Sequence, residues 1–174
     1  MKILILSDSH AHLSFMRRCI LAVKPDTVVH LGDYYDDGTA IAEEFGISRF
    51  YQVPGNCDKY RMVSLVPERL AQKVCGVMLF MTHGHHYPVK YQSYSAMIGD
   101  GRKAGAQAVC FGHTHEAYCL QEEDGLWVVN PGSCGTYGGS CAVIEAENNI
   151  IIGCRILRQP ELDALTEAEE KQGQ

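Results

Sequence analysis

Short polar motifs rich in aspartate and histidine recur along the first two-thirds of the chain. They are DSH at 8–10, GD at 32–33, GNCD at 55–58, THGH at 82–85 and GHTH at 112–115. Their candidate metal ligands are two aspartates, one asparagine and four histidines: Asp8, His10, Asp33, Asn56, His83, His113 and His115. Carboxylate, amide oxygen and imidazole groups suit hard and borderline divalent cations. Seven such groups exceed the needs of one tetrahedral ion and indicate two ions about 3.5–4 Å apart, bridged by one carboxylate.

Each motif comes directly after an apolar run that has the length of a buried strand. Strands are expected over 2–7, 27–31, 48–53 and 107–111, and two more within 69–83 that meet at Gly76. Helices are expected between them over 12–24, 37–46 and 91–105. In open α/β sheets the carboxyl ends of the strands converge on one ligand crevice. The strand ends would therefore bring all seven side chains into one pocket.

The pattern changes in the last third of the chain, where short apolar segments alternate with turn residues. Strands are expected over 117–122, 126–130, 140–147 and 151–157. The chain thus combines a parallel βαβ half with antiparallel strands that follow it. We predict an α/β fold in which two mixed β-sheets pack together with helices outside, a four-layer sandwich. A single mixed sheet is the alternative.

Length and composition favour one globular domain. The 174 residues are 46% hydrophobic, which is ordinary for such a domain. We assign the domain to 1–160 and an acidic C-terminal tail to 161–174. The tail has five acids and one lysine, and so carries −4 of the net charge of −6. Because the chain has no basic run to neutralise a phosphate backbone, stable nucleic-acid binding is not expected.

The apolar runs and the cysteines give an expectation for the cellular compartment. The longest apolar runs, ILIL at 3–6 and VMLFM at 77–81, are too short to span a bilayer. The N-terminus lacks the pattern of a secretory signal. None of the eight cysteines forms a C-x-x-C pair, which argues against a thiolate zinc site. We expect no membrane association and a reducing, cytoplasmic location.

The five motifs, in this order and context, resemble those of the calcineurin-like metallophosphoesterases. The chain is most similar to their small single-domain phosphodiesterases from bacteria and archaea, roughly over residues 1–157, and NPGS at 130–133 also resembles that branch. The resemblance implies a two-sheet α/β sandwich with a dinuclear site. It assigns one ion to Asp8, His10 and His115, the other to Asn56, His83 and His113, and makes Asp33 the bridging ligand. Mn is the expected metal, with Zn, Fe, Ni and Mg as alternatives.

The activity implied by the resemblance is hydrolysis of a small phosphoester by a hydroxide that bridges two divalent metal ions. Cys57 stands where phosphatase branches of the family carry a histidine that serves as general acid. Its thiol is a candidate proton donor, a neutral residue lining the site, or a redox-sensitive group. The departure favours diesters, or substrates with good leaving groups, over simple phosphomonoesters. We therefore predict a phosphodiesterase.

Two other functions are compatible with parts of the pattern. The first is a metal-binding but catalytically weak protein-interaction scaffold of the same fold, which is disfavoured because all seven ligands are present. The second is a metallo-β-lactamase-like hydrolase, because HGHH at 83–86 partly resembles the H-x-H-x-D-H run of those enzymes. The aspartate of that run is missing here. The antiparallel strands also offer an edge at which a homo-oligomer could form.

Some neighbouring residues have expected supporting roles. Asp58 is expected to brace the GNCD loop. NPGS is either a structural turn or a segment that brings Ser133 to the site. The resemblance places His85 near the metals without making it a primary ligand. His30 is expected within its strand, and His86 on the surface near the site.

Overall fold

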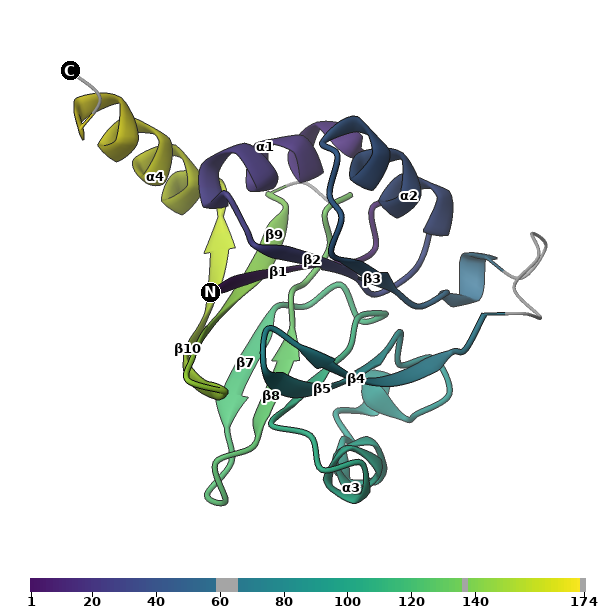
Figure 1. Cartoon of the computed structure of the whole chain (residues 1–174). Helices are drawn as coiled ribbons and strands as arrows, with labels where there is room; N and C mark the ends of the chain where they lie inside the picture. The colour runs from purple at the N-terminus through teal and green to yellow at the C-terminus, as the bar shows by residue number, and fades with distance from the viewer. Residues whose placement is uncertain (59–65, 136–137, 173–174) are drawn as a thin grey trace.

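The computed structural model describes residues 1–58, 66–135 and 138–172. Within these ranges ten strands form two mixed sheets of five strands each, and helices cover the outer faces of both sheets (Figure 1). This is the four-layer α/β sandwich that the pattern of strands and helices predicts. That prediction is confirmed, and the alternative of a single mixed sheet is wrong.

The first sheet combines the N-terminal parallel strands with the C-terminal hairpin, in the order β10-β9-β1-β2-β3. Its parallel strands are β1 (Lys2–Leu6), β2 (Thr27–His30) and β3 (Phe50–Gln52). Its antiparallel strands are β9 (Ser140–Glu147) and β10 (Ile150–Arg158). Because β9 pairs with β1, the beginning and the end of the chain meet in one sheet.

The second sheet has the order β4-β5-β6-β8-β7. Its three parallel strands are β5 (Val77–Thr82), β6 (Ala108–Cys110) and β8 (Trp127–Asn130). The antiparallel edges are β4 (Arg69–Val74) and β7 (Tyr118–Gln121). The turn between β4 and β5 falls at Gly76, as the sequence predicts.

Helices lie on the two outer faces of this pair of sheets. α1 (Leu13–Val23) and α2 (Tyr35–Glu44) cover the first sheet, and α3 (Ser95–Lys103) lies beyond the second sheet on the opposite side (Figure 1). Apolar residues fill each interface between helix and sheet. Between the sheets lies a third cluster, which includes the fully buried Ile5, Val29, Leu79 and Val129. Because both faces of the central strands are covered, these strands read as continuous apolar runs.

Two helices differ in extent from the expected ranges. α2 was expected over 37–46 and begins earlier, at Tyr35. The segment expected as a helix over 91–105 forms α3 from Ser95, preceded by a 3-10 turn, η3 (Val89–Tyr91). Gln92 has a φ of 56° and separates the two, because a left-handed residue cannot continue a right-handed helix.

The acidic C-terminal segment forms a helix, α4 (Gln159–Gln172). Leu162 is fully buried in the cluster that includes Met16 and Cys19 of α1, and Leu165 packs against that cluster. Arg18 of α1 also forms an ion pair with Asp163. The domain boundary at residue 160 stays a prediction. Among the described residues, none of the helices combines the length and the apolar character needed to cross a membrane.

Candidate metal centre

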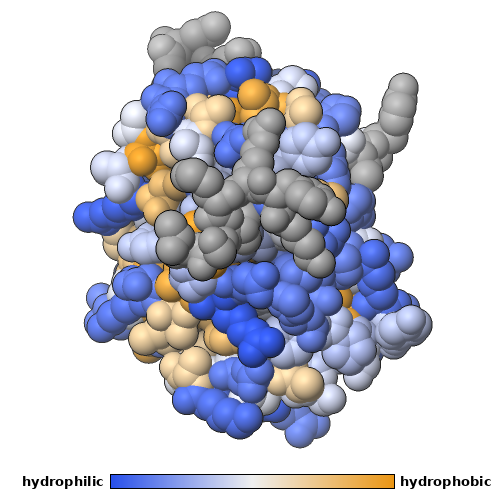
Figure 2. All heavy atoms as spheres, turned by 90° about the vertical axis from the view of Figure 1, so that its right-hand side faces the viewer, coloured by the Kyte–Doolittle hydropathy of each residue, from blue (hydrophilic) through white to orange (hydrophobic). Residues whose placement is uncertain are grey.

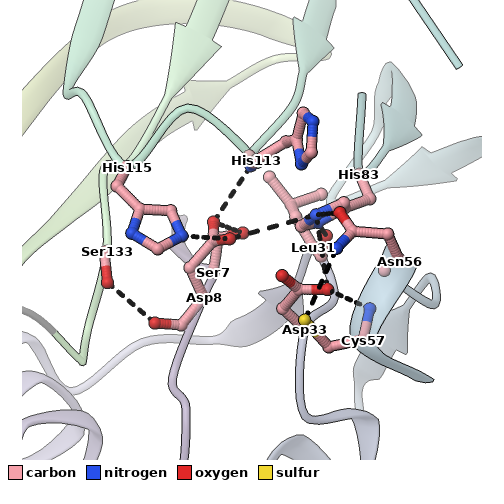
Figure 3. Close-up of polar contacts among 12 residues, drawn as sticks. Ser7, Asp8, Leu31, Asp33, Asn56, Cys57, His83, His113, His115 and Ser133 are labelled. Carbon is pink, nitrogen blue, oxygen red and sulfur yellow. Dashed lines mark hydrogen bonds and ion pairs between the residues drawn. The ribbon is translucent and has the colours of Figure 1, made fainter. Parts of the chain in front are cut away.

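The structure brings all seven predicted ligands to one edge, where the strand ends of the two sheets meet. Figure 3 labels Asp8, Asp33, Asn56, His83, His113 and His115 there. The first sheet contributes Asp8 and His10 after β1, Asp33 after β2 and Asn56 after β3. The second sheet contributes His83 after β5, and His113 and His115 after β6. Asn56 begins a short 3-10 helix, η1 (Asn56–Asp58). Neither sheet alone holds the whole set.

Asp8, His10, Asp33 and His115 form one half of the centre. Each offers a ligand atom, and these atoms all lie within 4.8 Å of one another. Nε2 of His10 lies 3.3 Å from Nε2 of His115 and 3.9 Å from Oδ2 of Asp33. Nε2 of His115 lies 3.2 Å from Oδ1 of Asp8. Four donors that converge at such distances have the composition of a cation site.

His83 is the centre of the other half. Its Nε2 lies 3.2 Å from Oδ1 of Asn56 and 3.5 Å from Oδ1 of Asp33. The ring of His113 lies 5.1 Å from that of His83, centroid to centroid. Nδ1 of His83 lies 2.7 Å from the carbonyl oxygen of Leu31, and since a carbonyl can only accept, Nδ1 donates. With one proton on Nδ1, a neutral His83 would offer the lone pair of Nε2 to a metal.

The hydrogen bonds of the Asp8 carboxylate indicate whether the residues present fit a metal. Its Oδ2 accepts hydrogen bonds from the Ser7 hydroxyl at 2.6 Å and from the His113 N–H at 3.1 Å. Its Oδ1 is buried and, within the described residues, accepts no hydrogen bond of good geometry, although His115 is near. A buried carboxylate oxygen without a hydrogen bond is costly unless a cation is its partner. The donor set therefore fits divalent cations.

The backbone at the centre adopts conformations that non-glycine residues rarely use. Asp8, His10, Asp33, His113 and His115 all have positive φ, between 44° and 68°. Such residues cost about 1–3 kcal/mol each and gather where function requires a particular side-chain direction. Five of the seven predicted ligands share this feature, so the strain coincides with the candidate site.

Two glycines allow the strand ends to approach closely. A Cβ at Gly55 would overlap the backbone and side chain of Asp33. A Cβ at Gly112 would overlap the Ser7 hydroxyl and lie 2.7 Å from Oδ2 of Asp8. The glycines of GNCD and GHTH are therefore required because the backbone passes directly against a ligand.

Local charges and burial shift the pKa values of three candidate ligands. Burial alone would raise the pKa of Asp8, but His115, His83 and the Ser7 hydroxyl together lower it. Burial, with the nearby His83 and Lys90, lowers the pKa of His113 to about 4. The Asp8 carboxylate raises the pKa of His115. His113 is thus neutral near pH 7, as a metal-binding imidazole must be.

Two further segments hold the loops of the centre in place. Asp58 accepts hydrogen bonds from the N–H groups of Tyr34, Tyr35 and Gly55, so its predicted bracing role is confirmed. In NPGS, the Ser133 hydroxyl donates to the Asp8 carbonyl at 2.8 Å. The side chain of Asn130 donates to the Gly112 carbonyl at 3.0 Å. NPGS is therefore a structural turn that supports the loops carrying two of the candidate ligand motifs, DSH and GHTH.

A cavity of about 530 Å³ adjoins the centre on the side of His10. Tyr34, Tyr35, Asp37 and Cys57 are among its lining residues. The ring of Tyr34 meets that of His10 edge-on at 5.3 Å. The sequence analysis did not select the tyrosines, because adjacent tyrosines at a helix start carry no signal of their own. Much of the molecular face on the side of η1 is hydrophilic (Figures 1 and 2).

Cys57 lies beside the candidate ligands Asp33 and Asn56. Its backbone N–H donates to Oδ1 of Asp33 at 2.8 Å, and its Sγ lies 3.4 Å from Nδ2 of Asn56. Partial burial, followed by the neighbouring Asp33, raises the pKa of the thiol to about 11. The thiol consequently keeps its proton at neutral pH.

Of the remaining histidines named from the sequence, one is buried in a strand and two lie after β5, near the centre. His30 is fully buried in β2, as expected. His85 lies beside the centre, with its ring 5.5 Å from that of His83. His86 is more exposed, and its Nε2 lies 2.6 Å from Oε2 of Glu68. The sequence analysis gave Glu68 no role.

Comparisons with known proteins identify the family and the fold. A family model described as "Calcineurin-like phosphoesterase superfamily domain" matches residues 1–149. A phosphodiesterase of Methanocaldococcus jannaschii is 29% identical, with 79% of this chain and 86% of that protein covered. The structure of a predicted phosphoesterase from Streptococcus pneumoniae has 21% identity and a TM-score of 0.67, covering 91% of this chain and 97% of that one. Zinc-bound Vps29 from Entamoeba histolytica has 19% identity and a TM-score of 0.70, covering 91% and 98%. The two structures show a shared fold alone.

Proposed function

Because this chain belongs to the calcineurin-like phosphoesterase superfamily, we propose that it is a dinuclear metal-dependent phosphodiesterase acting on a small phosphoester. The observation that carries the proposal is the position of Asp33 between the two ligand clusters. Its Oδ2 lies 3.9 Å from His10 and its Oδ1 lies 3.5 Å from His83. One carboxylate thus faces both clusters, as a bridging ligand must.

Each cluster has its own role in this proposal. Asp8, His10 and His115 hold one ion, and Asn56, His83 and His113 hold the other, with Asp33 shared. Two divalent ions held there would supply Lewis-acid chemistry: they would bind phosphate oxygens, lower the pKa of a water that attacks phosphorus, and stabilise charge on the phosphoryl group. The side chains of His10 and His115 are 28% and 37% exposed, so the substrate enters from their side.

Cys57 is proposed to line the site as a neutral group. A thiol whose pKa is raised to about 11 gives up its proton reluctantly near pH 7, so it is a weak general acid. It is also a slow target for oxidation, because the thiolate is the reactive form. Substrates whose leaving oxygen needs little protonation are then favoured. This reasoning supports diesters with good leaving groups over simple monoesters.

The cavity beside His10 is proposed to hold the organic part of the substrate. Its volume of about 530 Å³ fits a small molecule, and Tyr34 and Tyr35 supply aromatic surface. The net charge of −6 also favours a small phosphoester over a polynucleotide. Mn is the proposed metal, and zinc is the first comparator because the related Vps29 structure is a zinc complex.

The test is hydrolysis of an aryl phosphodiester and an aryl phosphomonoester with Mn, Zn, Fe, Ni or Mg. We expect the diester to be hydrolysed with at least one metal, and Asp33→Ala to lower the rate at least about 100-fold. No activity with any metal would overturn the proposal. Tightly bound metal without activity would instead support the scaffold alternative. Cys57→His should raise monoesterase relative to diesterase activity, and an unchanged ratio would refute the leaving-group argument.

A further inference from the structure

A second group of potential metal ligands lies beside the centre. Glu68, His85 and His86 each offer one ligand atom, and these atoms all lie within 4.8 Å of one another. None of the three belongs to the seven ligands assigned above. Two imidazoles and one carboxylate are the donor set that zinc uses in three-ligand protein sites.

The fold brings these residues together from two separate segments. Glu68 immediately precedes β4, whose first residue, Arg69, pairs with Thr82 at the end of β5. After β5 the chain turns at Gly84, which has a φ of 105°. That turn places His85 and His86 next to the start of β4. The group therefore depends on antiparallel pairing between β4 and β5.

The geometry within the group suits a single ion. Oε2 of Glu68 lies 2.6 Å from Nε2 of His86, and Oε1 lies 4.0 Å from Nε2 of His85. The two imidazole rings lie 4.0 Å apart, centroid to centroid. Donors to one zinc ion lie within about 4 Å of one another, because each bond is about 2 Å long. Each carboxylate oxygen of Glu68 lies within that limit of one imidazole nitrogen, Oε2 of the nitrogen of His86 and Oε1 of the nitrogen of His85.

The group is open to solvent on one side. A hollow of about 370 Å³ is lined by Glu68, Arg69 and His86. The side chains of Glu68 and His86 are 43% and 41% exposed, whereas His85 is 7% exposed. The guanidinium of Arg69 lies over the ring of Tyr87 at 5.0 Å, which gives that cation a partner of its own. A cation entering from solvent would meet a half-exposed carboxylate and imidazole with a second imidazole behind them.

We propose that Glu68, His85 and His86 bind a third divalent cation, of the borderline class that includes Zn²⁺, Co²⁺ and Ni²⁺. Imidazole ligands select these ions over Mg²⁺ and Ca²⁺. The site is next to the centre but separate from it. The ring of His85 lies 5.5 Å from that of His83 and 6.2 Å from that of His113.

The experiment counts metal ions bound by the full chain. Protein saturated with Co²⁺ and freed of excess is analysed by elemental mass spectrometry and by visible absorption. Wild type should bind three ions per chain, and Glu68→Gln and His86→Asn should each bind two. Glu43→Gln, which replaces an exposed glutamate on α2 outside the group, should still bind three.

Metal counts in the Asp33→Ala variant distinguish this proposal from the proposed function. In Asp33→Ala, loss of the centre should leave one equivalent of Co²⁺ that disappears when Glu68→Gln is added. If wild type and Glu68→Gln bind the same number of ions, the contact between Glu68 and His86 holds no metal and the third site is refuted. Equal losses in Glu68→Gln and Glu43→Gln would also refute it, because the third ion would then be bound nonspecifically. Absence of phosphoester hydrolysis would leave these counts unchanged.

Discussion

Replacing Asp58 with asparagine should loosen the GNCD loop without removing any candidate metal ligand. Asp58 is 9% exposed, and its carboxylate accepts three backbone hydrogen bonds. Oδ1 accepts from Tyr34 and Tyr35 at the start of α2, at 2.9 Å each. Oδ2 accepts from Gly55 at 2.7 Å. One side chain therefore caps α2 and holds the loop that carries Asn56.

The cost of Asp58→Asn follows from these contacts. The asparagine oxygen can still accept from the two N–H groups of α2, but its amide group would face the N–H of Gly55. A buried N–H that loses its acceptor costs about 1–3 kcal/mol. Loss of a negative charge at the N-terminus of α2 adds about 0.3–1 kcal/mol. We expect the free energy of unfolding to fall by about 1–4 kcal/mol, and metal affinity to fall about 10–100-fold.

Urea denaturation of the metal-free protein measures the first effect, and titration with a competing chelator measures the second. Asp26→Asn is the matched control, because Asp26 accepts one exposed N–H, from Lys2. It should change stability by no more than about 0.5 kcal/mol. If Asp58→Asn behaves like this control in both assays, the inference that these hydrogen bonds stabilise the protein and support metal binding is refuted.

The other predictions concern folding, the close approach at the centre, and α4. Burial lowers the pKa of His30 to about 4 from 6.5, so the folded state disfavours its protonated form. The free energy of unfolding should therefore fall as the pH drops from about 6.5 toward 4, by up to about 3 kcal/mol, and His30→Gln should flatten the pH dependence measured by urea denaturation. Gly112→Ala should weaken metal binding at least about 10-fold by calorimetry, because its Cβ would collide with the Asp8 region, whereas Gly99→Ala, in open space on α3, should leave affinity unchanged. Leu162→Ala should lower the free energy of unfolding, measured by urea denaturation, by about 2–5 kcal/mol, because its fully buried side chain packs α4 against α1. Leu21→Ala, at a residue 63% exposed, should have little effect.

The fold and the candidate ligands could be predicted from the sequence because their signals are local. Each ligand follows an apolar run of strand length, and parallel strands carry their carboxyl ends to one edge. His83 and His113 could therefore be placed near each other without knowledge of the packing. The glycines of GNCD and GHTH could be noted as turns, but their closeness to Asp33 and Asp8 appears only when the sheets are assembled.

Other features had no local signal. The segment after residue 160 is strongly acidic, and its acidity gives no sign that Leu162 is buried and Leu165 packs in the cluster that includes α1 residues. The supporting role of Ser133 depends on a hydrogen bond across 125 positions of the chain. Neither interaction leaves a periodic pattern that a reader of the sequence can detect.

The sequence by itself determined which chemical groups stand at the strand ends and, through the order of strands and helices, the class of fold. Tertiary structure alone decided which oxygen of Asp33 faces which histidine, and that Asp58 and NPGS brace the ligand loops. It also decided that Glu68 meets His85 and His86. The physical reason is that residue types and strand periodicity are properties of short sequence segments, whereas distances of 3–4 Å between candidate ligands depend on how the two sheets pack.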